Sequence, residues 1–404
     1  MRKIVVLILF FLCISMVLLG EVFSIYGPFT NLKRYNPEII DAKAEALGKS
    51  SILSSSGANF IFNNPAMLSI LSQKTIRVNC RANYGKDTSD LSGDLLEYEY
   101  PINLRFNGIS FGMPFNIPNN KVLKFSIGAG YRTYYDLSSN QHIEDKNSNF
   151  EIDIIYRGGF GNIVLGGGIS YQDKLLIGFS ASLPFLCNYS TEYNDIDNNE
   201  IKTEGTMKGT FFTLSGSYIF TDKITLGARF RTGFTLKWID TIDDDEVDLI
   251  VPPEFGLALE INPKSSLKFY VEYVTRNLSY YEIESNANNY KLYVDLNNGY
   301  SIRSGFETGM NTIFRGGFYL QSVPIYEIKD FMGDEVIHDE KPKTEIGFTT
   351  GLGIKVNTSV SIDFYGVYNF LKYDESYDSW YSGYNENVFS ISQMKIGCSI
   401  GYEF

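Results

Sequence analysis

Apolar and polar residues alternate along most of the chain, and a period of two is typical of β-strands that have one apolar face. From Met394 to Phe404 every second residue is apolar. The same alternation in 224–238 places Phe230 and Phe234 on one face. The opposite faces are rich in glycine and isolated charges, and many of the strands exceed about ten residues. These features indicate tilted strands that cross a membrane rather than the strands of a soluble sandwich.

The alternation predicts about fourteen strands, and an even number is typical of bacterial outer-membrane barrels. The strands are expected at 76–84, 108–115, 122–136, 162–172, 174–189, 209–220, 223–238, 254–262, 266–276, 299–308, 312–323, 345–356, 359–371 and 388–404. The connections between them alternate between tight turns and polar segments of about fifteen to twenty-five residues. The tight turns fall at 116–121, 173, 221–222, 262–265, 309–311 and 357–358, and the long segments at 137–161, 190–208, 239–253, 277–298, 324–344 and 372–387. We therefore predict an all-β fold, a transmembrane antiparallel β-barrel with short periplasmic turns and long external loops.

Residues 1–24 have the pattern of a secretory signal peptide. Arg2 and Lys3 precede an almost unbroken apolar run from Ile4 to Leu19. The run is shorter than the roughly twenty residues that span a bilayer as a helix, so a cleaved signal is favoured over a membrane anchor. We expect an exported protein of the bacterial cell outer membrane.

Aromatic residues collect near several strand ends, as at Tyr134 and Tyr135. We interpret them as part of a girdle at the membrane–water boundary, with cross-strand packing as the alternative. The chain ends on Phe404. A terminal aromatic after alternating apolar residues resembles the signal that barrel-assembly machinery reads in outer-membrane proteins. This machinery and outer-membrane lipid are therefore expected partners.

The segment 25–72, between the signal and the first strand, is too apolar for a solvated linker. Residues 42–48 predict a short helix ended by Gly48, and apolar residues follow at 60–62 and 67–68. Fourteen strands enclose a lumen too wide for their own side chains to fill. We predict that 25–72 forms a plug inside the barrel of residues 73–404. A periplasmic tether or a partner-binding tail is the alternative.

Charge and composition exclude several functions. A formal net charge of -12 argues against nucleic acid as a partner. Two histidines, His142 and His338, leave little for histidine catalysis or a zinc site. The four cysteines have no paired spacing and suggest neither a disulfide framework nor a metal cluster. We therefore expect no enzyme, no cofactor and no metal site.

Two stretches resemble the FadL-type outer-membrane transporters. The run 44–71 is similar to the N-terminal hatch of that family, and Asn64-Pro65-Ala66 with Leu68 match its Asn-Pro-Ala motif. The stretch 299–325 resembles a second family pattern through Arg315-Gly316-Gly317-Phe318 and Pro324. The glycine-rich run that usually follows the Ala-Leu-Gly of the hatch is replaced by Lys49-Ser50-Ser51.

The resemblance implies passage of hydrophobic small molecules, such as long-chain fatty acids or aromatic hydrocarbons, across the outer membrane. In the family a ligand moves from an external groove to a pocket beside the hatch. The residues expected to bind it are Phe60, Phe62, Asn64, Pro65, Ala66, Met67 and Leu68. Packing of the plug against the barrel wall is the alternative for each of them.

Four arginines on polar strand faces, Arg229, Arg231, Arg303 and Arg315, are candidates to meet a ligand carboxylate in the lumen. Ion pairs with acidic residues on nearby polar faces are the favoured alternative; these residues are Glu260, Glu272, Glu307 and Asp363.

Three functions stay open at this point. A transporter of hydrophobic solutes fits the hatch motif best. A non-transporting barrel of the same superfamily, acting as a scaffold or docking factor for secreted proteins, fits the altered glycine run. A general polar porin is opposed by the apolar plug sequence.

Overall fold

The computed structural model describes residues 41–91, 94–116, 122–136, 139–145, 150–194, 200–240, 246–276, 281–285, 290–294, 299–323, 343–379 and 383–404. The predicted signal peptide, residues 1–24, and the first part of the predicted plug, residues 25–40, lie outside this range.

The described N-terminal part contains four short helical segments. They are α2 (Ala42–Ala46), η2 (Gly57–Asn59), α3 (Phe60–Asn63) and η3 (Pro65–Ile70). The Asp41 carboxylate caps α2. Pro65 stands at the start of η3, where the N–H that proline lacks has no helical partner to lose. Among the described residues, these helices are too short to cross a bilayer.

Almost all the rest of the described chain is strand. The strands are β1 (Thr75–Leu91), β2 (Asp94–Asn116), β3 (Leu123–Asp136), β4 (Ser139–Asp145), β5 (Phe150–Tyr171), β6 (Leu175–Pro184), β7 (Asn188–Asn194), β8 (Glu200–Lys208), β9 (Phe211–Thr221), β10 (Ile224–Arg231), β11 (Phe234–Asp240), β12 (Glu246–Val251), β13 (Glu254–Lys264), β14 (Leu267–Arg276), β15 (Tyr281–Ser285), β16 (Tyr290–Val294), β17 (Gly299–Gly309), β18 (Thr312–Val323), β19 (Lys343–Lys355), β20 (Val360–Ser379) and β21 (Gly383–Glu403).

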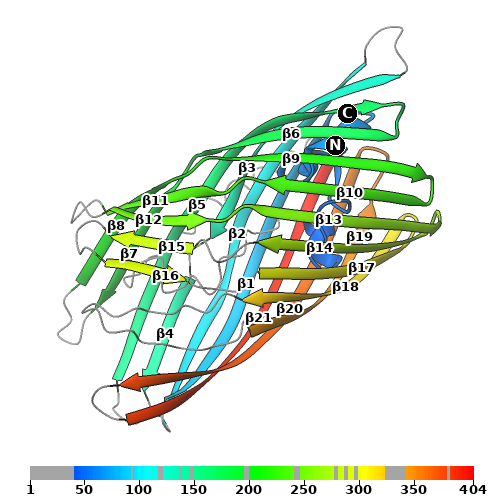
Figure 1. Cartoon of the computed structure of the whole chain (residues 1–404). Coiled ribbons are helices and arrows are strands. Elements are labelled where there is room, and N and C mark those ends of the chain that lie inside the picture. The colour runs from blue at the N-terminus through cyan, green and yellow to red at the C-terminus, as the bar shows by residue number, and fades with distance from the viewer. Residues whose placement is uncertain are drawn as a thin grey trace, which may run out of the picture.

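These strands form one antiparallel sheet that closes on itself (Figure 1). Strands pair in chain order, and β1 pairs with β21 as well as with β2. Several consecutive segments, such as β10 and β11, are two parts of one strand with a break between them. Counted in this way the segments make a closed barrel of fourteen strands, which confirms the predicted fold class.

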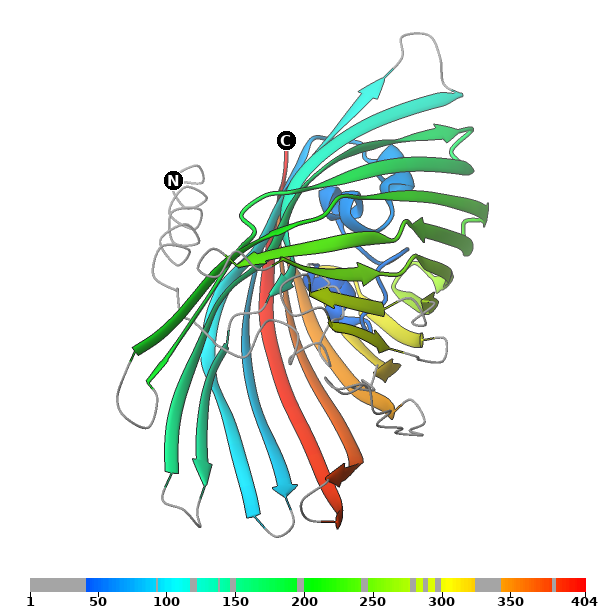
Figure 2. The same ribbon diagram turned by 60° about the vertical axis from the view of Figure 1, so that its left-hand side comes forward.

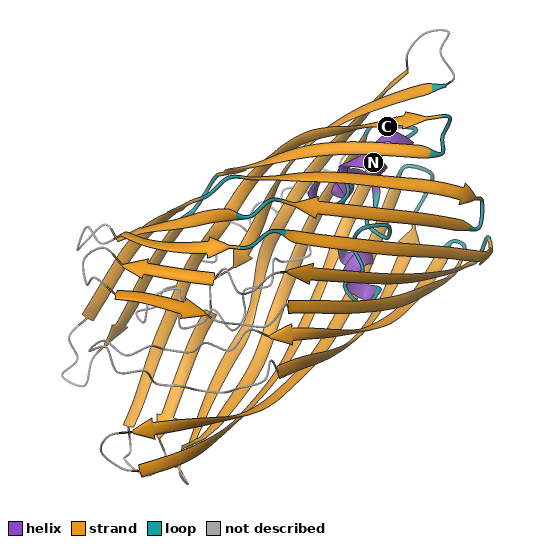
Figure 3. Ribbon diagram, viewed as in Figure 1, coloured by secondary structure: helices purple, strands orange, loops and turns teal. Residues whose placement is uncertain are grey.

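One end of the barrel carries tight turns, which Figure 3 draws in teal. They lie at 172–174, 222–223, 265–266, 310–311 and 356–359, close to the predicted positions. Most of the predicted turn at 116–121 lies outside the described residues.

At the opposite end the strands are longer than predicted. β4 and the first part of β5 cover most of 137–161, β7 and β8 cover most of 190–208, and the ends of β20 and β21 cover most of 372–387. The prediction of long loops in these segments was wrong. Strands β12, β15 and β16 also occupy parts of 239–253 and 277–298. Backbone pairing needs no apolar face, so a strand continues after its apolar alternation has ended.

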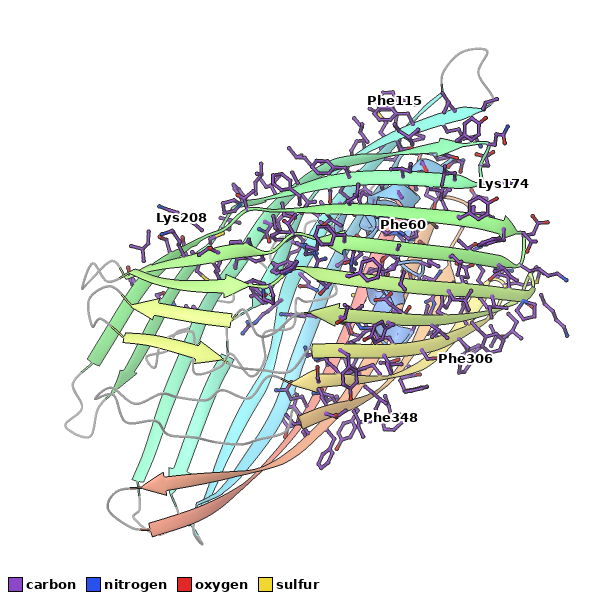
Figure 4. The ribbon with its side chains drawn as sticks, viewed as in Figure 1. Phe60, Phe115, Lys174, Lys208, Phe306 and Phe348 are labelled. Carbon is purple, nitrogen blue, oxygen red and sulfur yellow. The ribbon has the colours of Figure 1, made fainter. Side chains whose placement is uncertain are left out.

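The outside of the barrel is apolar around the half that carries the tight turns. In β6 every second side chain is exposed, as for Phe179, and the side chains between are buried, as for Ser180. Figure 4 shows Phe115, Phe306 and Phe348 on the outer surface, and Phe348 is 62% exposed. Membrane strands present such a surface to lipid.

The N-terminal helical segments lie inside the barrel (Figure 2). α2 packs against β19 and β20, and η3 packs against β3, β5 and β6 on the other side of the ring. The segment therefore spans the lumen, as predicted. We refer to its described residues, 41–71, as the hatch.

Candidate functional site in the barrel lumen

The Asp41 carboxylate joins α2 to the part of the hatch that begins at Ser56. The Asp41 side chain accepts hydrogen bonds from the backbone N–H of Lys43 (2.8 Å) and of Ala44 (3.2 Å). It also accepts bonds from the backbone N–H of Ser56 (2.8 Å) and from Asn59 Nδ2 (2.9 Å). Bonds to a charged acceptor are stronger than neutral ones, so Asp41 fixes the shape of the hatch.

A second carboxylate fastens the hatch to the wall. Glu272 of β14 is fully buried and accepts the backbone N–H groups of Ser51 (2.6 Å) and Ile52 (2.7 Å). Arg303 of β17 donates to the same carboxylate at 2.8 Å. Its Nη1 also donates to the backbone oxygen of Lys49 at 3.2 Å. The segment that replaces the family's glycine-rich run is therefore the part of the hatch that Glu272 and Arg303 hold.

The Asn-Pro-Ala motif makes a third contact with the wall. Asn64 Nδ2 donates to the Ile52 backbone oxygen (2.8 Å) and to Ser217 Oγ on β9 (3.1 Å). The Ala66 N–H donates to Ser215 Oγ at 3.0 Å. The motif thus ties the start of η3 to Ile52 of the hatch and joins the hatch to β9.

Glycines of the wall let the hatch backbone approach closely. A Cβ atom on Gly178 of β6 would lie 2.1 Å from the Ala66 nitrogen. A Cβ atom on Gly317 of β18 would lie 2.3 Å from the Gly48 nitrogen. Other wall glycines in similar contact with the hatch are Gly168, Gly227, Gly305 and Gly351. Each of these glycines lacks a side chain at the point where the hatch lies against its strand.

The apolar hatch residues predicted to bind ligand are all buried. Phe60, Phe62, Met67 and Leu68 belong to one apolar core with Val164, Leu176, Ala258 and Tyr270 of the wall. In this structure they pack the hatch against the barrel.

Each of the four predicted lumen arginines has a carboxylate partner. Arg229 and Arg231 pair with Glu254 of β13, and Arg303 pairs with Glu272. Arg315 lies 3.2 Å from Glu307 and 2.8 Å from Asp363. These are mutual ion pairs within the lumen, although Glu254 was absent from the predicted partners.

An aromatic cluster lies in the lumen on the side of the hatch away from the tight turns. It consists of Tyr134 (β3), Tyr135 (β3), Phe160 (β5), Phe211 (β9) and Phe234 (β11), all buried. The ring centroids of Tyr134 and Phe211 are 4.8 Å apart, and those of Phe211 and Phe234 are 4.9 Å apart. Because β3 and β9 are not neighbours in the sheet, these rings meet inside the barrel. Tyr134 and Tyr135 are therefore not girdle residues, and that prediction was wrong.

Arg132 of β3 stands between this aromatic cluster and the hatch. Its Cζ atom is 4.6 Å from the Tyr134 ring centroid and 5.5 Å from that of Phe62. Its Nη1 donates to the Phe62 backbone oxygen at 3.4 Å. Arg132 is only 1% exposed, and its Nε and Nη2 have no hydrogen-bond partner among the described residues. A buried guanidinium with unused donors is suited to an anionic ligand group.

Beside the aromatic cluster the positions that face inward and outward exchange along the strand formed by β10 and β11. Arg231 and Phe234 both point inward across the break at 232–233, so the alternation shifts by one position. Phe230 is 44% exposed while Phe234 is 8% exposed, which corrects the prediction that they share a face. Beyond the break the exposed outward residues of β11 are Thr235 and Lys237. The apolar outer surface of the barrel ends at this break, and the aromatic cluster lines the lumen on the inside.

The opposite side of the hatch is charged. A cavity of about 980 Å³ opens among the tight turns at 265–266, 310–311 and 357–359. Its lining includes Lys43, Arg77, Lys268, Glu307, Arg315 and Asp363. The hatch therefore separates an aromatic region of the lumen from a polar vestibule.

No protein-family model and no curated protein matches the sequence. Among solved structures, a FadL homologue from Pseudomonas aeruginosa aligns with a TM-score of 0.61 over 90% of this chain and 98% of that chain, at 11% identity. The chain has the FadL-type fold. The toluene transporter TodX from Pseudomonas putida aligns at 12% identity with a TM-score of 0.57, covering 90% of this chain and 99% of its own. TbuX, a toluene transporter from Ralstonia pickettii, aligns at 12% identity with a TM-score of 0.54, covering 92% and 100%. In this FadL-type barrel the hatch occupies the lumen.

Proposed function

We propose that this FadL-type barrel is an outer-membrane channel for hydrophobic small molecules. The observation that carries the proposal is the aromatic cluster, which stands on the hatch at Phe62 together with Arg132. Burial of an apolar solute yields roughly 25 cal/mol per Å², and aromatic rings provide such surface. The vestibule beyond the hatch presents charged side chains, such as Lys43, Glu307 and Arg315, beside its apolar ones.

The hatch would control passage. Phe60, Phe62, Met67 and Leu68 are packed against the wall, so a ligand reaches them only when the hatch moves. Asn64, Pro65 and Ala66 hold the bend that presents these side chains. The rings of the aromatic cluster are buried as well, so we infer that they move apart to admit a ligand. The ligand then contacts Phe60, Phe62, Asn64, Pro65, Ala66, Met67 and Leu68 as the hatch shifts.

Within this proposal, Arg132 favours ligands that carry a carboxylate, such as long-chain fatty acids. An aromatic hydrocarbon would use only the rings, whereas a carboxylate would also accept the unused Nε and Nη2 donors of Arg132. The other lumen arginines, Arg229, Arg231, Arg303 and Arg315, have carboxylate partners on the wall and would serve to hold the lumen together.

The test compares binding of a long-chain fatty acid with that of an uncharged alkane of equal length by the purified full-length protein. Arg132→Gln should weaken fatty acid binding by about tenfold to a hundredfold, since a hydrogen bond to a charged group is worth about 1.5–3 kcal/mol. Alkane binding should be unchanged. Equal loss for both ligands would contradict the carboxylate role, and no binding of either ligand by the wild type would contradict the proposed function.

The alternative is a non-transporting barrel that acts as a scaffold or docking factor for secreted proteins. The hydrogen bonds that Glu272 accepts from Ser51 and Ile52, and the bond that Arg303 donates to Lys49, favour it because they fasten the hatch firmly. Transport requires that these bonds open, so a hatch that stays closed in the presence of every hydrophobic solute would support the scaffold.

Phe404 would serve in assembly rather than in transport. Its side chain is exposed at the end of β21, where barrel-assembly machinery can reach it. Deletion of Phe404 should reduce the amount of folded barrel in the outer membrane without changing ligand affinity of the molecules that do fold. Unchanged assembly would refute this role.

A further inference from the structure

We propose that Cys80 and Cys398 form a disulfide bond across the seam at which the barrel closes. Cys80 lies on β1 and Cys398 on β21, the first and last strands, and the two residues are direct partners in the antiparallel register. Residues 25–404 contain three cysteines, the third being Cys187. A strand residue has only one direct partner on each neighbouring strand, so chance would rarely bring two of three cysteines together.

The register gives the geometry of the pair. The Phe404 N–H donates to the Lys74 backbone oxygen at 3.0 Å, and the register continues without a shift from there to Cys80 and Cys398. Hydrogen-bonded pairs recur at every second position, so the two cysteines form such a pair, with Cα atoms about 5.5 Å apart. This is the usual Cα separation in disulfides. The structure describes both side chains as thiols without a disulfide. The Cβ atoms of a hydrogen-bonded pair lie about 5.5 Å apart and those of a disulfide about 3.8 Å, so the seam has to tighten by more than about 1 Å when the bond forms.

Both cysteines belong to the outward row. Asn79 and Arg81, on either side of Cys80 in β1, are buried and face the lumen. Ile396, two positions before Cys398, is exposed on the outer surface. Direct partners share a face, so the two sulfur atoms meet on the lipid side of the seam. There the finished bond is shielded from water-soluble reductants.

The seam is where a covalent link has the largest effect. The other pairings join strands that follow one another along the chain, whereas Cys80 of β1 and Cys398 of β21 are separated by roughly 320 residues of sequence. The entropy lost on closing a loop rises with its length. A bond between Cys80 and Cys398 would remove this loss from the last step of closure and would keep the barrel from opening.

The bond forms by thiol–disulfide exchange with an oxidised protein of the thiol-oxidase class in the periplasm. The thiolate of one cysteine attacks the donor disulfide, forms a mixed disulfide and releases one donor thiolate. The thiolate of the other cysteine then attacks the mixed disulfide, forms the Cys80–Cys398 bond and releases the second donor thiolate. Two electrons pass to the donor, whose two thiolates take up the two protons. Because thiolates are disfavoured in hydrocarbon, exchange precedes burial of the seam in the membrane.

The test uses the full-length protein exported to the outer membrane and denatured in the presence of a thiol-alkylating reagent. Mass spectrometry should find one alkylated cysteine before reduction, at Cys187, and three after reduction. Cys187→Ser is the matched control, because Cys187 lies elsewhere, with its sulfur 3.0 Å from the Gly161 backbone oxygen. This variant should show none before reduction and two after it.

Cys398→Ser removes one partner and should leave Cys80 and Cys187 both alkylated before reduction. Three alkylated cysteines in the unreduced wild type would overturn the proposal. A disulfide mapped to Cys187, or one that joins two chains, would overturn it as well. The readout does not depend on ligand or transport, so it stands apart from the proposed function.

Discussion

At the scale of single residues, two buried carboxylates determine where the hatch lies. Asp41 joins parts of the hatch to one another, and Glu272 joins the hatch to β14. Breaking a buried ion pair by removing one charge costs about 3–5 kcal/mol, because the other charge stays buried. Glu272 has Arg303 as its charged partner, so its neutralisation acts on both the wall and the hatch.

Glu272→Gln should loosen the hatch while the barrel stays assembled. The amide keeps one oxygen acceptor, but its NH₂ group then faces other donors from Arg303 or from the Ser51 and Ile52 backbone. The steady conductance of the variant in planar bilayers should rise toward that of a protein lacking residues 25–72. Glu260→Gln is the matched control, since Glu260 pairs with Lys268 rather than with the hatch. Wild-type conductance in the Glu272 variant would show that Glu272 does not hold the hatch in place.

The hatch motif could be recognised from the sequence, but the groups around it could not. Asn64-Pro65-Ala66 is a local pattern, and the apolar residues near it indicate burial. Arg132 carries no such signal, because its importance comes from rings on other strands and from Phe62. In the same way, the opposition of Cys80 and Cys398 follows only from the register of the closed barrel.

At the scale of elements, alternation predicted where strands run inside the membrane and failed where they leave it. The apolar residues keep even positions through 224–238, yet the break at 232–233 moves Phe234 from the outside to the lumen. A two-residue break is invisible in a pattern whose period continues across it. Beyond the break the strands continue with polar outer positions, so the sequence gives no apolar alternation by which to extend them.

The fit between η3 and β6 can be tested with a glycine substitution. Gly178→Val places a side chain where the Ala66 nitrogen lies, so η3 should leave the wall at a cost of about 1–3 kcal/mol. The hatch of this variant should become susceptible to protease added to the purified protein, and fatty acid binding should fall. Gly216→Val on β9 is the control, because its Cβ atom would meet nothing nearer than 3.7 Å. Equal protease resistance of the two variants would contradict the close contact.

At the scale of the whole molecule, polarity is arranged in three levels along the barrel axis. The vestibule at the tight turns is charged, the hatch level is packed, and the aromatic cluster follows where the outer surface becomes polar. An apolar outer belt surrounds only the first two levels, so the bilayer lies there and the aromatic level stands near its far boundary. Short turns of outer-membrane barrels are periplasmic, so we predict that the aromatic cluster faces the cell exterior.

This orientation can be tested with single cysteines introduced into the Cys80→Ser/Cys187→Ser/Cys398→Ser background. Lys208 of β8 is exposed on the polar side of the break, and Lys174 lies in the tight turn between β5 and β6 (Figure 4). A membrane-impermeant maleimide applied to intact cells should label Lys208→Cys and leave Lys174→Cys unlabelled until the cells are broken. Phe348→Cys, which faces lipid, should stay unlabelled in both preparations because the reagent does not enter the hydrocarbon. Labelling of Lys174→Cys but not Lys208→Cys in intact cells would invert the barrel. The aromatic cluster would then face the periplasm and could not be the first site that an incoming solute meets.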